Sequence, residues 1–135
     1  MGLRRESWER AIAHVERVLR GSKISVTRGR GHYPWLIASD GSRRVEIECH
    51  GEEGRGPRHL GPRLEPRAGL YAIWVHLGEG GTPVYSDILP APEAVKRLDK
   101  ESAWCAVGGD IGFRNRWDLL GFPSLRAEPP RPASS

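Results

Sequence analysis

The 135-residue sequence contains only two cysteines and no run of about 18 apolar residues. Without such a run, no segment can cross a bilayer as a helix. Cys49 and Cys105 are too few for a disulfide framework, and their apolar, strand-like surroundings favour buried, reduced thiols. The first residues, Met-Gly-Leu-Arg-Arg-Glu, also lack the apolar stretch of a signal peptide. We therefore expect one cytoplasmic domain without a membrane segment.

Lysine is scarce, because 18 of the 21 basic residues are arginine. The formal net charge is +4, and it is unevenly distributed. Residues 1–67 hold 14 Arg and Lys against 9 Asp and Glu, whereas residues 68–135 hold 7 against 8. A basic surplus in one half suits a surface that contacts phosphates. Enrichment in Arg, Gly and Pro also fits a high-GC genome, so composition alone leaves both explanations open.

Apolar residues recur at helical spacing over residues 6–20, which predicts an amphipathic helix. These residues are Trp8, Ile12, Val15 and Leu19. Gly21 is placed to end this helix in the left-handed conformation. A short strand over 22–28 follows, and the Gly-, Pro- and Arg-rich segment 51–68 is predicted to be a long loop.

The second half of the chain is predicted to add two strands, a helix and a last short strand. In chain order these are strands over 70–77 and 82–89, a helix from Pro92 to about Ser102, a strand over 103–107 and an irregular segment over 108–126. The element order predicts a single α+β domain over residues 1–126, with a central mixed β-sheet flanked by helices. The Pro- and Ser-rich tail, 127–135, is expected to be disordered.

The most informative segment is 35–50, WLIASDGSRRVEIECH. Its residues alternate in character on both sides of an Asp40-Gly41 turn, which is a strong hairpin signal. In the first strand Trp35 shares a face with Ile37 and Ser39. In the second strand the acidic and imidazole side chains share one face, and the apolar side chains share the other. The polar set is Glu46, Glu48 and His50, and the apolar set is Val45, Ile47 and Cys49.

This hairpin resembles the core hairpin of the restriction-endonuclease-like nucleases, including Holliday-junction-resolvase-like members. Their pattern is D-L-I-A-x-D-G followed by a strand that ends in E-x-K. The first strand and turn match through Leu36, Ile37, Ala38, Asp40 and Gly41, and Glu48 matches the Glu of E-x-K. Trp35 stands where the family has a metal-binding Asp, and His50 stands where it has Lys.

The resemblance implies a restriction-endonuclease-like core in which an Asp and a Glu hold Mg²⁺ and a Lys activates water. Trp35 offers no oxygen ligand, so we expect a degraded metal site with Glu48 as its remaining carboxylate. An active alternative would combine Glu48 with a relocated carboxylate and use His50 as a general base. The carboxylates considered are Glu46, Glu52, Glu53, Glu9 and Glu16.

A solvated face for Glu46, Glu48 and His50, with a structural histidine, is the favoured alternative to catalysis. A zinc site built from Cys49, His50 and His59 is disfavoured, because adjacent residues of a strand point to opposite faces. Trp35 itself is expected in the core.

The sequence therefore predicts a nucleic-acid-binding protein of nuclease ancestry that grips the backbone of DNA or RNA. The arginines expected to contact phosphates are Arg28, Arg30, Arg43, Arg44, Arg55, Arg58, Arg63 and Arg67. No cofactor is expected unless the site cleaves, in which case it requires Mg²⁺. The alternatives are a metal-dependent endonuclease with relocated ligands and a protein-interaction or assembly module, such as a homodimer.

Overall fold

Six segments of the chain, 2–29, 35–53, 58–59, 65–99, 104–105 and 111–126, are described in the computed structural model. The helices are α1 (Gly2–Gly21) and α2 (Ala91–Lys96), with short 3₁₀ turns η1 (Glu79–Gly81), η2 (Ile111–Phe113) and η3 (Trp117–Leu120). The strands are β1 (Ser25–Arg28), β2 (Trp35–Ser39), β3 (Arg44–Glu53), β4 (Arg58–His59), β5 (Leu70–Leu77), β6 (Pro83–Pro90), β7 (Leu98–Asp99) and β8 (Trp104–Cys105).

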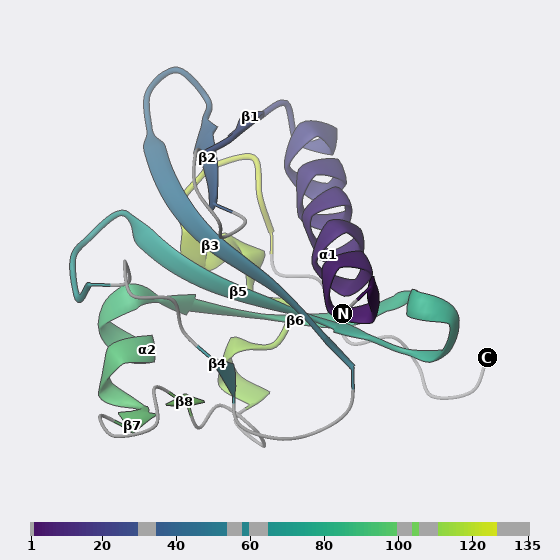
Figure 1. The fold of residues 1–135 in the computed structure, drawn as a ribbon. Helices are drawn as coiled ribbons and strands as arrows, with labels where there is room; N and C mark the ends of the chain where they lie inside the picture. Colours follow the sequence, from purple (N-terminus) through teal and green to yellow (C-terminus); the bar gives the residue numbers. More distant parts are fainter. Residues whose placement is uncertain are drawn as a thin grey trace.

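Five of these strands form the main sheet, in the order β1-β2-β3-β5-β6. β1, β2 and β3 are antiparallel neighbours, β3 and β5 run parallel, and β6 returns antiparallel to β5. Figure 1 shows α1 lying along β3. The smaller sheet has the order β4-β8-β7.

One face of the main sheet, here called the α1 face, carries the larger core. Alternate residues of β3 and β5 point toward it, as period-two geometry requires. Val45, Ile47 and Cys49 pack there with Ile12 and Val15 of α1. The same cluster includes residues of the C-terminal segment, namely Trp117, Leu120, Phe122 and Leu125. Helix α1 and the C-terminal segment therefore share one hydrophobic core.

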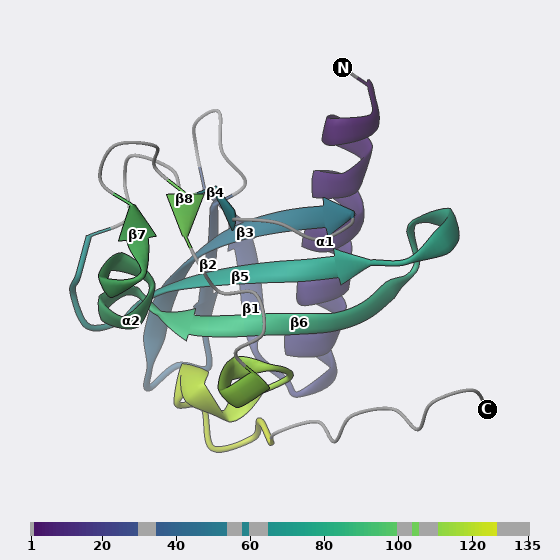
Figure 2. The same cartoon turned by 90° about the horizontal axis from the view of Figure 1, so that it is seen from below.

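The opposite face, here called the α2 face, carries two small clusters. Trp74 packs with Ala94 of α2, and Trp35 packs with Ala91. Figures 1 and 2 both show α2 beside β7 and β8. Among the residues whose side chains are described, the α2 face buries fewer apolar side chains than the α1 face.

The predicted fold class is confirmed, since the chain forms one α+β domain with a mixed sheet and two helices. The predicted loop over 51–68 is wrong in two places, although residues 65–68 lie outside any helix or strand, as predicted. Strand β3 continues to Glu53, because Glu53 still pairs with Leu77 of β5, and β4 lies inside the segment. The predicted helix over 92–102 is too long, because β7 begins at Leu98. The tail 127–135 lies outside the described residues.

Helix α1 ends with a left-handed residue two positions later than predicted. Lys23, not Gly21, has a positive φ of 62°. The amide of Ile24 donates to the carbonyl of Leu19 and the amide of Lys23 donates to the carbonyl of Arg20, each at 3.0 Å. These two bonds are the Schellman pattern, in which the left-handed position normally holds glycine.

Replacing Lys23 with glycine should raise the free energy of unfolding by about 1 kcal/mol, because glycine adopts positive φ without the Cβ clash. Lys23 is exposed, so few contacts are lost with its side chain. Urea denaturation measures the change. Lys23→Ala is the control, because alanine removes the same side chain and retains the strain. An equal gain in both variants would contradict the strain explanation.

Candidate functional site

The predicted hairpin forms, with its turn at Asp40 and Gly41 as predicted. Trp35 pairs with Glu48, Ile37 with Glu46 and Ser39 with Arg44. Asp40 builds the turn, since its Oδ1 accepts hydrogen bonds from the amides of Ser42 at 2.9 Å and Arg43 at 2.8 Å. The bond from the Ser42 amide is the main reason that the pKa of Asp40 lies below its ordinary value. Asp40 therefore acts as a turn residue.

The solvated face expected for Glu48 and His50 is wrong, because both side chains are buried. Glu48 is 0% exposed and His50 is 5% exposed, whereas Glu46 stays half-buried. Oε2 of Glu48 lies 3.4 Å from Nε2 of His50. Helix α2 packs on this face of the sheet. The alternation of residues along one strand cannot indicate whether another element covers the face. The two predicted catalytic residues are thus together, inside the protein.

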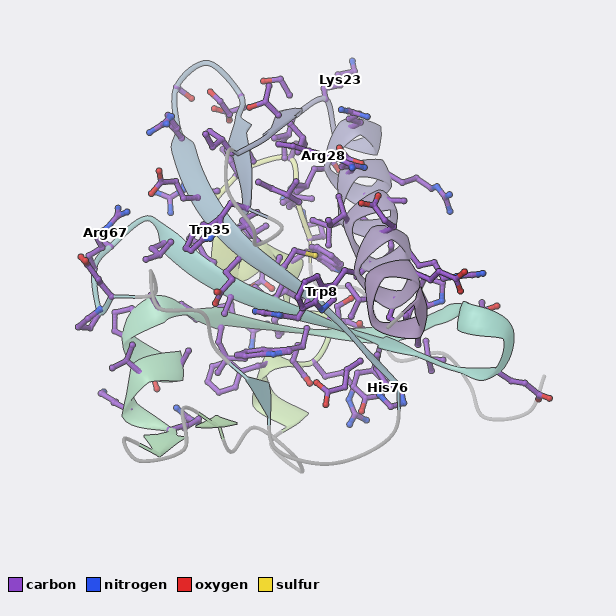
Figure 3. All side chains as sticks on the ribbon, viewed as in Figure 1. Trp8, Lys23, Arg28, Trp35, Arg67 and His76 are labelled. Atoms are coloured by element: carbon purple, nitrogen blue, oxygen red, sulfur yellow. The ribbon has the colours of Figure 1, made fainter. Side chains whose placement is uncertain are left out.

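Aromatic rings hold His50 on two sides. The imidazole stacks on Trp74 of β5 with ring centroids 6.0 Å apart, and Trp8 of α1 meets it edge-on at 6.3 Å. Figure 3 shows Trp8 near the N-terminal end of α1, close to β3. The neighbouring strands pair His50 with Trp74 and Trp74 with Asp87, and Asp87 is also buried. Asp87 was missed from the sequence, although it is the one charged residue of the β6 segment.

Trp35 occupies the position facing Glu48, as the hairpin register requires. It is buried, which confirms the predicted core position. On the other side of Glu48 the paired residue is Ala72 of β5. Neither neighbouring strand therefore supplies a carboxylate beside Glu48. Within the described part of the chain, no group of three His, Cys, Asp or Glu residues could hold a metal ion.

Several carboxylates were considered as relocated metal ligands. Those whose side chains the structure describes already form other interactions. Glu9 and Glu16 of α1 bind Arg28, with Nη1 to Oε2 at 3.2 Å and Nη2 to Oε1 at 3.1 Å (Figure 3). Glu46 accepts from Arg67 at 2.5 Å. The side chain of Glu53 is outside the described part. Two carboxylates of α1 thus form ion pairs with an arginine of β1, so their role is structural.

Cys49 points to the α1 face, away from His50, and this opposite orientation is the reason that a zinc site shared by the two was disfavoured. Burial raises the pKa of its thiol, so it remains protonated at neutral pH. The prediction of a buried, reduced thiol is confirmed for Cys49. The side chains of Cys105 and His59 lie outside the described residues.

The predicted phosphate-contacting arginines fall into four groups. Arg28 and Arg67 are in ion pairs, and the hydrogen bond to Glu16 is the main reason that the pKa of Arg28 is raised. Arg43 donates to the carbonyl of Leu120 at 2.7 Å and to the hydroxyl of Tyr71 at 2.9 Å. Arg44 is exposed. Arg30, Arg55 and Arg63, and the side chain of Arg58, lie outside the described residues.

No helix in the described segments is long and apolar enough to cross a membrane. Comparison of this chain with known protein families, curated proteins and solved structures finds no match.

Proposed function

We propose that this protein binds nucleic acid and does not cleave it through Glu48, on a scaffold derived from a restriction-endonuclease-like nuclease. The observation that carries the loss of cleavage is the cross-strand pair of Trp35 and Glu48. Mg²⁺ requires several oxygen ligands in near-octahedral geometry. A buried indole in place of the second carboxylate removes both an oxygen ligand and the space for the ion.

Charge supports nucleic acid as the ligand. The net charge is +4, and the basic surplus lies entirely in residues 1–67, which include the hairpin. Arg44, at the start of β3, and Lys23, at the end of α1, are exposed, and neither has an ion-pair partner in the described part of the chain. Figure 3 shows Lys23 pointing outward. Such side chains can neutralise phosphates and release counterions.

Binding of labelled duplex DNA, single-stranded DNA and RNA should weaken steeply as salt increases, because each neutralised phosphate releases counterions. Arg44→Ala should weaken binding to all sequences alike and reduce the slope of log K against log salt by about 1. Fluorescence anisotropy at several salt concentrations measures both quantities. Lys96→Ala is the matched control, since Lys96 is exposed but paired with Glu93 at 3.5 Å in the acidic half. No binding at low salt would overturn the proposal.

A cleavage assay separates this proposal from an active nuclease. Plasmid, single-stranded DNA and RNA incubated with Mg²⁺ or Mn²⁺ should remain intact, with the wild-type protein and with Glu48→Ala alike. Cleavage that disappears in Glu48→Ala would establish the relocated-ligand alternative instead.

The protein-interaction module is the second candidate. Arg28, Arg43 and Arg67 already bind other groups of the chain, which weakens the argument for phosphate binding. Those are three of the four predicted phosphate contacts whose side chains are described. Light scattering tests the simplest version, a homodimer of the 15.0 kDa chain. A dimer whose formation is insensitive to salt, in a protein without nucleic-acid affinity, would favour this candidate.

A further inference from the structure

Arg114 differs from the other half-buried arginines of the described segments. Arg43, Arg97 and Arg116 each donate to an oxygen of the protein, at 2.7, 2.9 and 2.9 Å. No such acceptor for Arg114 lies among the described residues, and its Nε is buried without a hydrogen bond. A buried N–H group without an acceptor costs free energy, so its presence needs an explanation. An acceptor supplied by a bound ligand would remove this cost.

The guanidinium of Arg114 is held in place by an aromatic ring. Its central carbon lies 4.0 Å from the ring centroid of Tyr85, which is a cation–π contact. Tyr85 in turn stacks on its cross-strand neighbour His76, with centroids 4.6 Å apart and an angle of 11° between the rings. Figure 3 shows His76 close to the end of β3. His76, Tyr85 and Arg114 therefore form a group that is here called the Arg114 stack.

The backbone that carries Arg114 is also fixed. Arg114 forms an antiparallel bridge with Asp87 of β6. The amide of the next residue, Asn115, donates to the carbonyl of Ser86 at 2.6 Å, and its Oδ1 accepts from the amide of Ser86 at 2.9 Å. Asn115 has a positive φ of 55°, which asparagine tolerates better than most residues. The guanidinium therefore needs little ordering when a ligand binds.

Two carboxylates flank the Arg114 stack and limit what it can bind. Asp87, opposite Arg114, is 4% exposed, so it lies beneath the surface that a ligand contacts. Glu52 of β3 pairs with His76 at the other end of the stack and is half-buried. The positive charge is therefore local to Arg114, which suits one phosphate better than a row of phosphates. Charge counting does not indicate this position, because residues 68–135 hold 7 basic against 8 acidic residues.

A guanidinium held on an aromatic ring suits an unpaired nucleotide. Its N–H groups match phosphate oxygens, and bases of single-stranded segments stack on guanidinium planes as well as on aromatic rings. Proteins that bind single strands combine such cations with aromatic side chains, because every unpaired base offers a flat face for stacking. Tyr85 and His76 are both half-buried, so neither is sealed inside the core.

We infer that Arg114, held by Tyr85 and His76, binds an unpaired nucleotide, and that the protein therefore prefers single-stranded to duplex nucleic acid. The inference rests on the proposed nucleic-acid binding and names its substrate class. It adds a contact beside the end of β5, whereas Arg44 lies at the start of the parallel strand β3.

Fluorescence anisotropy tests the inference with a labelled single strand and with the duplex that this strand forms with its complement. The wild type should bind the single strand more tightly. Arg114→Ala should weaken single-strand binding about tenfold, which lies within the range for loss of one base stack. It should also reduce the slope of log K against log salt by about 0.7. Arg114→Lys keeps the charge and loses the planar group, so it should weaken binding and leave the slope unchanged.

Arg116→Ala is the matched control. It removes an arginine two positions away whose Nη2 already binds Oδ2 of Asp118 at 2.9 Å, so it should bind the single strand as the wild type does. Circular dichroism verifies the fold of each variant, and Arg114→Lys carries the test if Arg114→Ala does not fold.

Three results would count against the inference. Wild-type affinity of Arg114→Lys for the single strand would overturn it, and so would equal affinity of the wild type for the two probes. Both of these results leave the proposed nucleic-acid binding intact. Failure of the wild type to bind either probe at low salt would instead overturn the proposed function, and this inference with it.

Discussion

Replacing Gly51 with alanine should lower the free energy of unfolding by about 3 kcal/mol or more, because the added methyl group meets backbone atoms. A Cβ at this position would lie 2.6 Å from the carbonyl carbon of Ser7, and closer still to its oxygen. It would also lie 3.2 Å from the Cβ of Ala11. Both residues belong to α1. Relief of the overlap therefore requires the whole helix to move away from β3, since no flexible side chain can give way.

Urea denaturation followed by circular dichroism measures this loss. Gly21→Ala is the matched control, because a Cβ at Gly21 meets nothing within 4 Å and the residue lies at the end of α1. The control should leave stability unchanged or raise it by up to about 1 kcal/mol, given the higher helix propensity of alanine. If Gly51→Ala loses less than the typical 1 kcal/mol of a point substitution, the close approach of α1 and β3 is wrong.

The Gly51 variant also bears on the candidate site. Helix α1 brings Trp8 to the imidazole of His50, and Gly51 is the next residue along β3. A shift of the helix should therefore loosen the ring contact while the pairing of Trp35 with Glu48 stays intact. The close approach of α1 to β3 at Gly51 thus lies next to His50, one of the two buried polar residues of the candidate site.

The hairpin could be predicted because its determinants are local. The turn depends on Asp40 and on the positive φ of 96° at Gly41, and the strand faces follow from alternation. Register follows from turn geometry once the turn is fixed. The match of Trp35 with Glu48 was therefore available from the sequence, including the absence of a carboxylate on β2 opposite Glu48.

The burial of Glu48 and His50 could not be predicted from the same alternation. A strand with polar residues on one face looks identical whether water or a second layer covers it. Here Ala91 and Ala94 of α2 pack on that face with Trp35 and Trp74, and both alanines lie more than 40 positions beyond His50 in the chain. The cover depends on contacts distant in sequence, and no local pattern encodes them.

The arginines show the same limit. Arg43 was expected to face phosphates because it is an arginine of the basic half, yet its guanidinium binds Tyr71 and Leu120. Leu120 is 77 positions away. The charge of an arginine indicates which ligands it can bind. Which carbonyl or hydroxyl groups of the protein it binds instead depends on the tertiary fold. Arg44 is thus a sharper test of phosphate binding than Arg43, since the loss of Arg43 would also disturb the C-terminal segment.

Introducing an Asp where the nucleases that the hairpin resembles have one, by Trp35→Asp, should first destabilise the protein by about 4 kcal/mol, because a large buried ring is lost from the core. The new carboxylate would also face Glu48 across the strands, and two like charges in a buried place repel. If the hairpin retains the geometry of a nuclease, Mg²⁺ should recover part of this loss. At 100 times the dissociation constant, a ligand bound only by the folded state contributes about 2.7 kcal/mol.

Thermal unfolding with and without Mg²⁺ measures the recovery, and two proteins serve as controls. The wild type has the indole in place of the ligand, so Mg²⁺ should leave it unchanged. Trp35→Ala creates the same space without the carboxylate, so it should be destabilised and should also ignore Mg²⁺. Recovery confined to Trp35→Asp would mean that the strands still hold the spacing of a two-carboxylate site. If Mg²⁺ changes the thermal stability of the two variants equally, the resemblance to the nucleases is limited to the hairpin pattern and does not extend to the chemistry.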